Sequence, residues 1–287
     1  MSQPWKITGF ADEISNDLQE QIDGLRKLDM HYVEMRGVDG NNLIYHTDEK
    51  VREIRKRLDD AGISLSACGS PLGKIDITDP FEPHLEQLKR AIDVAHAMGI
   101  RTIRMFSFYV PAEKRKEYQA EVFERIGRMV RCAEAHDGVL LHENEKGIYG
   151  EMAPECLELM KAFYGDHFKA IFDFANFVQA GQNTLEAYEM LKPYIEYIHI
   201  KDAVAETGNV VPAGMGDGHV AEILSGLRAS GFNGFLSIEP HLGHFSGFEL
   251  LEKNGISIAK DTKPLEGFDA FALAHQSLIC VLNDIAR

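Results

Sequence analysis

The stretch FKAIFDFANFVQAGQNTLEAYEMLKPYIEYIHIKDA, residues 168–203, contains one full repeat of the pattern that decides the fold. The short apolar run Phe168–Phe172 predicts a buried strand, Leu185–Leu191 predicts a helix, and the apolar run Ile195–Ile200 predicts the next strand. Strands that alternate with helices indicate a parallel sheet, because each helix returns the chain to the end where the previous strand began.

The same alternation extends in both directions and gives eight strand–helix units of about 36 residues each. We expect the strands at Lys6–Phe10, Tyr32–Met35, Ile63–Ala67, Thr102–Phe108, Val139–His142, Phe168–Phe172, Ile195–Ile200 and Phe235–Ile238. We expect the helices at Ser15–Leu28, Asp48–Ala61, Pro83–Met98, Glu113–His136, Pro154–Phe163, Leu185–Leu191, Val220–Ser230 and Phe268–Ile285. Eight units predict an α/β fold of the closed (β/α)8 TIM-barrel type. The alternative is an open doubly wound sheet, but no GxGxxG motif follows the first strand.

One domain accounts for residues 1–287, since no linker or low-complexity tract marks a boundary. Ser15 is the expected N-cap of the first helix. The segment 241–267 after the eighth strand is long enough to fold over the barrel mouth as a lid.

Composition and charge narrow the classes of molecule that we expect the protein to bind. Lys and Arg number 30 and Asp and Glu number 45, for a net charge of −15, which disfavours nucleic acid and anionic membranes. The four cysteines match no zinc pattern and are expected to be reduced thiols. No signal peptide or membrane span is evident, so we expect a cytoplasmic protein.

Chemistry-bearing residues follow four consecutive predicted strands. In a TIM barrel the carboxyl ends of the strands form the active site, so residues just past each apolar run can meet there. These residues are Glu143, Asp173, His199 and Glu239. Three carboxylates and one imidazole suit Mn²⁺ or Mg²⁺, with Co²⁺ or Zn²⁺ as alternatives. The alternative for each residue alone is a helix cap, a solvated charge or a structural histidine.

The segments HENEKGIYG, FDFANFVQAG, IHIKDA and LSIEPH, with GFADEIS and GSPLGKI nearer the start, resemble the sugar-phosphate isomerase/epimerase family. That family belongs to the xylose isomerase-like barrel superfamily, and the resemblance covers nearly the whole chain. It implies that Glu143, Asp173, His199 and Glu239 hold one divalent metal ion. It also implies that Glu143 and Glu239 are catalytic and exchange a substrate proton next to a carbonyl, through a metal-stabilised enediolate. The expected partner is a small carbohydrate, and relatives suggest a dimer or tetramer.

Asn176 departs from the family pattern. Ketose 3-epimerases often carry a substrate-binding histidine three residues past the aspartate of the sixth strand, and Asn176 stands there. The metal chemistry is unaffected by this change, whereas a ketose substrate becomes less well supported. We expect Asn176 itself to contact the substrate.

Four further residues are expected to bind substrate, and three of them have a structural alternative. Lys201 either binds a substrate oxygen or pairs with Asp202 at the rim. Arg104 binds an anionic group or pairs with a barrel carboxylate. Lys74 is expected to contact substrate from the loop after the third strand. His241 either closes over substrate or is a surface histidine.

Three other features have structural interpretations. Glu13 and Glu34 are expected to cap helices or form barrel salt bridges, and His142 is expected to face away from the site. The loop GMGDGH, residues 214–219, either cradles a phosphate or forms a tight turn with Asp217 near the N-cap of the next helix.

Three competing functions remain. The same site permits a lyase that dehydrates a keto-sugar or inosose, because proton removal can expel a β-hydroxyl. A related endonuclease branch needs about three zinc ions and histidines on other strands. No histidine follows the second, third or fourth predicted strand, which disfavours that branch. The third alternative is a non-catalytic sugar-binding barrel.

Overall fold

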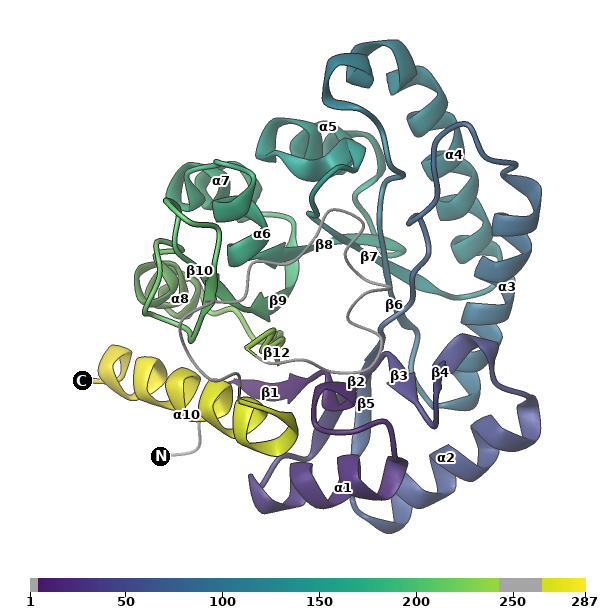
Figure 1. Cartoon of the computed structure of the whole chain (residues 1–287). Coiled ribbons are helices and arrows are strands. Elements are labelled where there is room, and N and C mark those ends of the chain that lie inside the picture. The colour runs from purple at the N-terminus through teal and green to yellow at the C-terminus, as the bar shows by residue number, and fades with distance from the viewer. Residues whose placement is uncertain (1–4, 243–264) are drawn as a thin grey trace.

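A computed structural model of the chain describes residues 5–242 and 265–287. Eight parallel strands form a nearly closed barrel in a single domain, as Figure 1 shows. The barrel strands are β1 (Lys6–Gly9), β2 (Tyr32–Met35), β5 (Ser64–Cys68), β6 (Thr102–Met105), β7 (Val139–Glu143), β8 (Phe168–Asp173), β9 (Ile195–Ile200) and β12 (Phe235–Ile238). They pair in the order β1-β12-β9-β8-β7-β6-β5-β2, and β1 lies beside β2 to complete the circle. The predicted barrel is confirmed.

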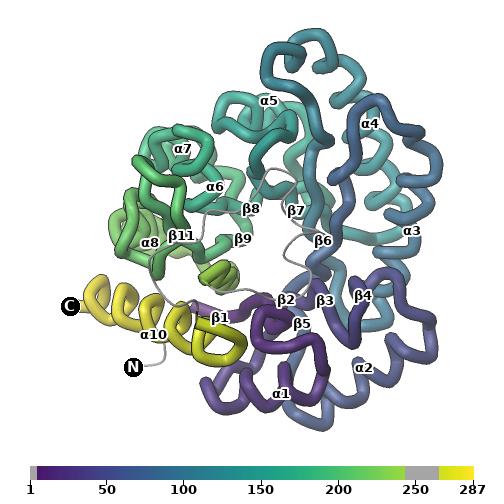
Figure 2. The backbone as a smooth tube through the Cα atoms, viewed as in Figure 1, coloured from purple at the N-terminus to yellow at the C-terminus, as the bar shows by residue number. Residues whose placement is uncertain are grey.

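Helices surround the barrel on its outside, as the tube in Figure 2 makes plain. They are α1 (Leu18–Lys27), α2 (Asp48–Asp60), α3 (Glu82–Ala97), α4 (Arg115–Ala135), α5 (Ala153–Phe163), α6 (Phe174–Gln179), α7 (Thr184–Leu191), α8 (Val220–Ala229) and α10 (Gly267–Ile285). Four 3-10 turns lie between them at η1 (Ala11–Glu13), η2 (Leu43–Tyr45), η3 (Ala112–Lys114) and η4 (Tyr149–Glu151). None of these helices combines the length and apolarity needed to cross a bilayer.

Sequence periodicity missed some local elements. Two small hairpins, β3 (Gly37–Val38) with β4 (Asn41–Asn42) and β10 (Asp202–Ala203) with β11 (Val210–Val211), lie outside the barrel sheet. The short helix α6 was also not expected, because six residues carry too little periodicity. The predicted N-cap of α1 was wrong: the carboxylate of Asp17, not Ser15, accepts the free N–H groups of the first turn.

The barrel separates two apolar regions. Strand residues such as Val33, Leu140 and Ile198 face outward and pack in the main core against the helices. Alternate residues such as Leu141 and Tyr197 face inward and form a small cluster inside the barrel. Glu143 and His199 lie two positions further along the same strands, on the inward face. The small apolar cluster inside the barrel therefore ends where the polar site begins.

Candidate metal centre

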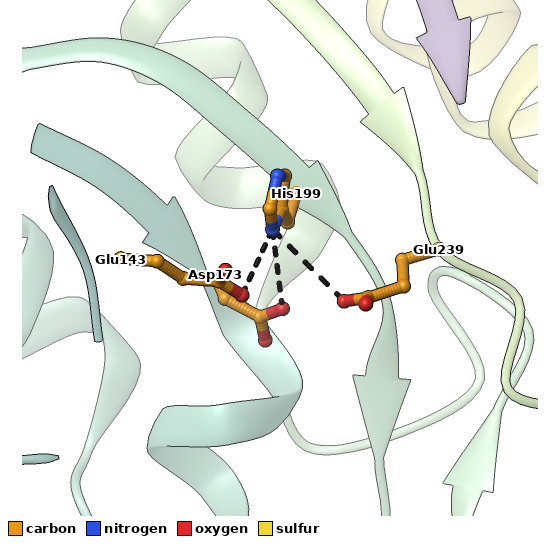
Figure 3. A group of neighbouring side chains, drawn as sticks. All are labelled: Glu143, Asp173, His199 and Glu239. Carbon is orange, nitrogen blue, oxygen red and sulfur yellow. Dashed lines mark hydrogen bonds and ion pairs between the residues drawn. The ribbon is translucent and has the colours of Figure 1, made fainter. Parts of the chain in front are cut away.

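Four side chains from neighbouring strands converge at the carboxyl end of the barrel. Glu143 and Asp173 are the last residues of β7 and β8. His199 lies near the end of β9, and Glu239 directly follows β12. Figure 3 shows the three carboxylates gathered beside the imidazole. One ligand atom from each residue lies within 4.8 Å of the others, and all four side chains are buried.

The imidazole nitrogen Nδ1 of His199 is the centre of this group. It lies 2.9 Å from Glu143 Oε1 and 3.9 Å from both Asp173 Oδ2 and Glu239 Oε2. An octahedral Mg²⁺ or Mn²⁺ with ligands at about 2.1 Å spaces adjacent ligand atoms by about 3 Å and opposite ones by about 4.2 Å. The spacing of the four ligand atoms therefore suits a divalent cation.

Asp173 is fixed by its neighbours so that one carboxylate oxygen is available. Its Oδ1 accepts the backbone N–H of Asn176 at 2.7 Å and thereby caps α6. The side chain of Asn144 binds both the N–H and the C=O of Asp173, at 2.9 and 3.0 Å. Asp173 Oδ2 is buried and accepts no hydrogen bond from any residue in the described part of the chain, although Lys201 Nζ lies 3.3 Å away. A buried acceptor without a donor is unfavourable, and a cation would satisfy it.

Negative charge exceeds positive charge around this centre. The connected buried network contains six carboxylates and three permanent cations: Asp12, Glu13, Glu34, Glu143, Asp173 and Glu239 with Arg36, Arg104 and Lys201. These nine residues carry a net charge of −3. Glu143 and Glu34 outweigh burial and raise the pKa of His199 well above its usual range, so with His199 protonated the net charge is −2. Uncompensated buried charge is strongly unfavourable, so either protons or a divalent cation must reduce it.

The excess of negative charge affects the protonation of Asp173. Burial, followed by repulsion from Glu239 and Glu143, raises the pKa of Asp173 to about 7, despite the attraction of Lys201. A carboxylate with that pKa holds a proton part of the time near neutral pH, and metal binding would displace the proton.

The pKa values of Glu143 and Glu239 are lowered, whereas that of Asp173 is raised. Burial alone would raise the pKa of Glu143, but His199 and Arg104 hold it at about 2. Burial would also raise the pKa of Glu239, yet Lys201 keeps it well below its usual range. Both glutamates are therefore ionised at neutral pH.

The three predicted cationic substrate contacts each pair with a carboxylate. Their nitrogen-to-oxygen distances are 2.8 Å for Lys201 to Glu239, 2.9 Å for Lys74 to Glu145 and 3.2 Å for Arg104 to Glu143. The ion-pair alternative for Arg104 is thus confirmed. Substrate contact stays a prediction for all three residues.

Asn176 and His241 also lie at the site. The Asn176 amide donates to Asn144 O at 2.9 Å and lies 3.4 Å from Glu143 Oε1, so it helps to hold Glu143. His241 is buried, which makes the surface alternative wrong, and its Nε2 lies 3.3 Å from Glu239 Oε1. Substrate contact by either residue remains a prediction. The rest of the predicted lid, residues 243–264, lies outside the described residues.

The loop after β9 excludes one of the alternatives considered for Lys201. Asp202 does not pair with Lys201. Instead, its carboxylate accepts backbone N–H groups from Gly214, Gly216 and Gly218 at 2.9–3.0 Å. The glycine-rich loop therefore wraps an internal carboxylate, not a phosphate. Asp217 lies two residues before His219, the N-cap residue of α8, as expected, and its side chain accepts the N–H of Ala205.

Arg36 is a site residue that the sequence analysis missed. Its guanidinium contacts Asp12, Glu13 and Glu239 at 2.8, 3.3 and 3.1 Å and stacks on the ring of Phe10. It follows β2 directly, so the strand-end rule that found the other residues could have found it. His142 faces the other way and bonds Ser107, as expected.

A family model described as a xylose isomerase-like TIM barrel matches residues 22–259 of the chain. The chain belongs to this family. A 3-dehydroshikimate dehydratase of Bacillus anthracis is 21% identical over 171 residues, which are 59% of this chain. That match spans only 61% of the relative, less than two thirds of its length. A 2-epi-5-epi-valiolone 7-phosphate 2-epimerase of Actinoplanes sp. is 28% identical over 204 residues, covering 68% of this chain and 71% of the relative.

A solved structure shares the fold. The xylose isomerase-like TIM barrel protein of Mycobacterium smegmatis, in complex with magnesium, superposes with a TM-score of 0.70 at 16% identity and full coverage of both chains. Members of this barrel family therefore include an epimerase and a dehydratase, and one structure holds a divalent ion.

Proposed function

We propose that this protein is a divalent-metal-dependent isomerase or epimerase of a sugar or sugar derivative. The observation that carries the proposal is the meeting of two buried, ionised glutamates, Glu143 and Glu239, at a four-residue ligand set. Similarity to an epimerase and to a magnesium-bound barrel supports it.

Each residue has a part in this proposal. Glu143, Asp173, His199 and Glu239 would hold the ion, which when bound would act as a Lewis acid toward the substrate carbonyl. One glutamate removes the proton next to the carbonyl, and the other returns a proton to the opposite face. Lys201 lies 2.8 Å from Glu239 Oε2 and favours its ionised form, while Arg104 does the same for Glu143. Lys74, Asn176 and His241 complete the wall against which the substrate is oriented.

Exchange of substrate hydrogen with solvent tests this function. Ketoses, their phosphates and 3-keto-glycosides are incubated with the Mn²⁺-loaded protein in deuterated water and followed by NMR. We expect deuterium at a carbon next to the carbonyl, with exchange about 10²- to 10⁴-fold slower in Glu143→Gln and Glu239→Gln. Glu158→Gln is a matched control, since Glu158 on α5 bonds Tyr149 and Gln119 outside the site. Binding of a sugar without exchange would instead support a non-catalytic barrel.

A dehydratase is the second candidate, favoured by the similarity to 3-dehydroshikimate dehydratase. Here Glu143 or Glu239 removes the same proton, but the β-hydroxyl leaves as water. Mass spectrometry of the products separates the two candidates. An epimerase or isomerase conserves the substrate mass, whereas a dehydratase product lacks one water.

A further inference from the structure

Glu34 is a fully buried carboxylate beneath the ligand set. It lies on β2, across the barrel from β9, and its Oε2 is 3.1 Å from Nε2 of His199. The hydroxyl of Ser237 on β12 donates to the same oxygen at 2.6 Å. Glu34 therefore receives two hydrogen bonds on one oxygen, while its Oε1 is buried and accepts none among the described residues.

The contacts of His199 distinguish its two nitrogens. Nδ1 faces the three carboxylates of the ligand set, and Nε2 faces Glu34. An imidazole that binds a metal through one nitrogen needs its proton on the other, and that proton requires an acceptor. Glu34 is within hydrogen-bond distance of Nε2 and stands on the side away from the ligand set. Glu34 can accept a hydrogen bond from the N–H at Nε2. Nδ1 then carries no proton and is free to bind the ion.

Alternation along β2 directs Glu34 inward, because Val33 before it faces outward. The register between β2 and β5 shifts between Val33 and Glu34, so that Ser66 is an extra residue on β5. Such bulges re-aim side chains near active sites. Ser66 then bonds Thr8 and Tyr197, each at 2.8 Å, and this polar layer lies next to Glu34 and Ser237.

We propose that Glu34 is a positioning residue that fixes the Nε2–H tautomer of His199 and so sets its Nδ1 as the metal ligand. The proposal rests on the proposed metal-dependent function, and it adds a residue that does not touch the ion. Loss of such a hydrogen-bond acceptor behind a ligating histidine typically weakens metal binding by about 10- to 100-fold.

Calorimetric titration with Mn²⁺ measures this effect without any substrate. We expect the Kd of Glu34→Ala to rise by about 10- to 100-fold over wild type. Glu34→Gln should lose less, because its amide oxygen still accepts the Nε2–H. Thr8→Val is the matched control: Thr8 is equally buried in the same layer and bonds Ser66, and its Kd should match wild type.

A second measurement needs no variant. Nitrogen-15 NMR of the Mg²⁺-loaded wild type should show His199 protonated at Nε2 and unprotonated at Nδ1. This measurement does not depend on whether Glu34→Ala folds. The opposite tautomer would overturn the proposal, as would a folded Glu34→Ala whose Kd lies within threefold of wild type.

Different results would refute the metal site and the role of Glu34. A wild type that binds no Mn²⁺ or Mg²⁺ would refute the metal site and the role of Glu34 together. A wild type that binds the ion while Glu34→Ala or Thr8→Val behaves against expectation would refute only the role of Glu34.

Discussion

Metal affinity should depend on pH through Asp173. Burial and the neighbouring carboxylates raise the pKa of Asp173 to about 7, and its Oδ2 must be unprotonated to bind an ion. With that pKa, the ionised fraction is about 0.9 at pH 8 and about 0.1 at pH 6. Asp173 alone should therefore weaken Mn²⁺ binding about tenfold between pH 8 and pH 6.

Asp173→Asn isolates this effect. The amide oxygen of asparagine can still accept the N–H of Asn176, so the cap of α6 and the local fold are preserved. The variant should bind Mn²⁺ more weakly at both pH values, because one charged ligand is lost. Its ratio of Kd at pH 6 to Kd at pH 8 should be about tenfold smaller than that of wild type.

Calorimetric titration in buffers that do not bind metal gives both ratios. Repeating it in buffers of different ionisation enthalpy counts the protons released on binding. Equal ratios for wild type and Asp173→Asn would refute the role assigned to Asp173, as would a wild-type Kd that does not change between pH 6 and pH 8.

Three further predictions concern the metal-free protein and its fold. Arg36→Met should lower the free energy of unfolding by about 3–5 kcal/mol in urea titrations, because it leaves buried carboxylates without a partner; a loss below 1 kcal/mol would contradict this. Gly73→Ala should destabilise the protein and lower its melting temperature, since Gly73 has φ +87° and an added Cβ would clash with the backbone oxygen of Phe106; an unchanged melting temperature would count against it. In EDTA, the raised pKa of Asp173 contributes stability that is present below about pH 4 and lost as the pH rises through about 7. Urea unfolding at several pH values measures the free energy of unfolding. In wild type this free energy should fall over that pH range by an amount that Asp173→Asn does not show, and identical pH profiles for the two proteins would contradict the prediction.

The barrel, and the convergence of the four candidate ligands at one rim, followed from the sequence for a simple physical reason. The period of strand and helix is carried by local hydrophobic patterning, and a barrel brings the carboxyl ends of all its strands to one rim. Any residue just past an apolar run is thereby a candidate, and Glu143, Asp173 and Glu239 were found in this way.

Partners within the site were harder to predict. The sequence neighbours Lys201 and Asp202 suggest an ion pair, yet alternation along the chain sends them to different surroundings. The strand-end rule places Arg36 at the rim, but its three carboxylate partners, which come from η1 and from beyond β12, could not be predicted. Contacts of this kind depend on how distant strands are placed around the barrel, which local patterning does not encode.

The most direct test of the account is the metal content of the protein. Wild type, His199→Ala and Thr8→Val are dialysed against Mn²⁺, freed of excess metal and measured by inductively coupled plasma mass spectrometry. The account predicts about one ion per chain in wild type and in Thr8→Val, and a large loss in His199→Ala. A wild type that holds no ion after this treatment, or a His199→Ala that holds as much as wild type, would contradict it.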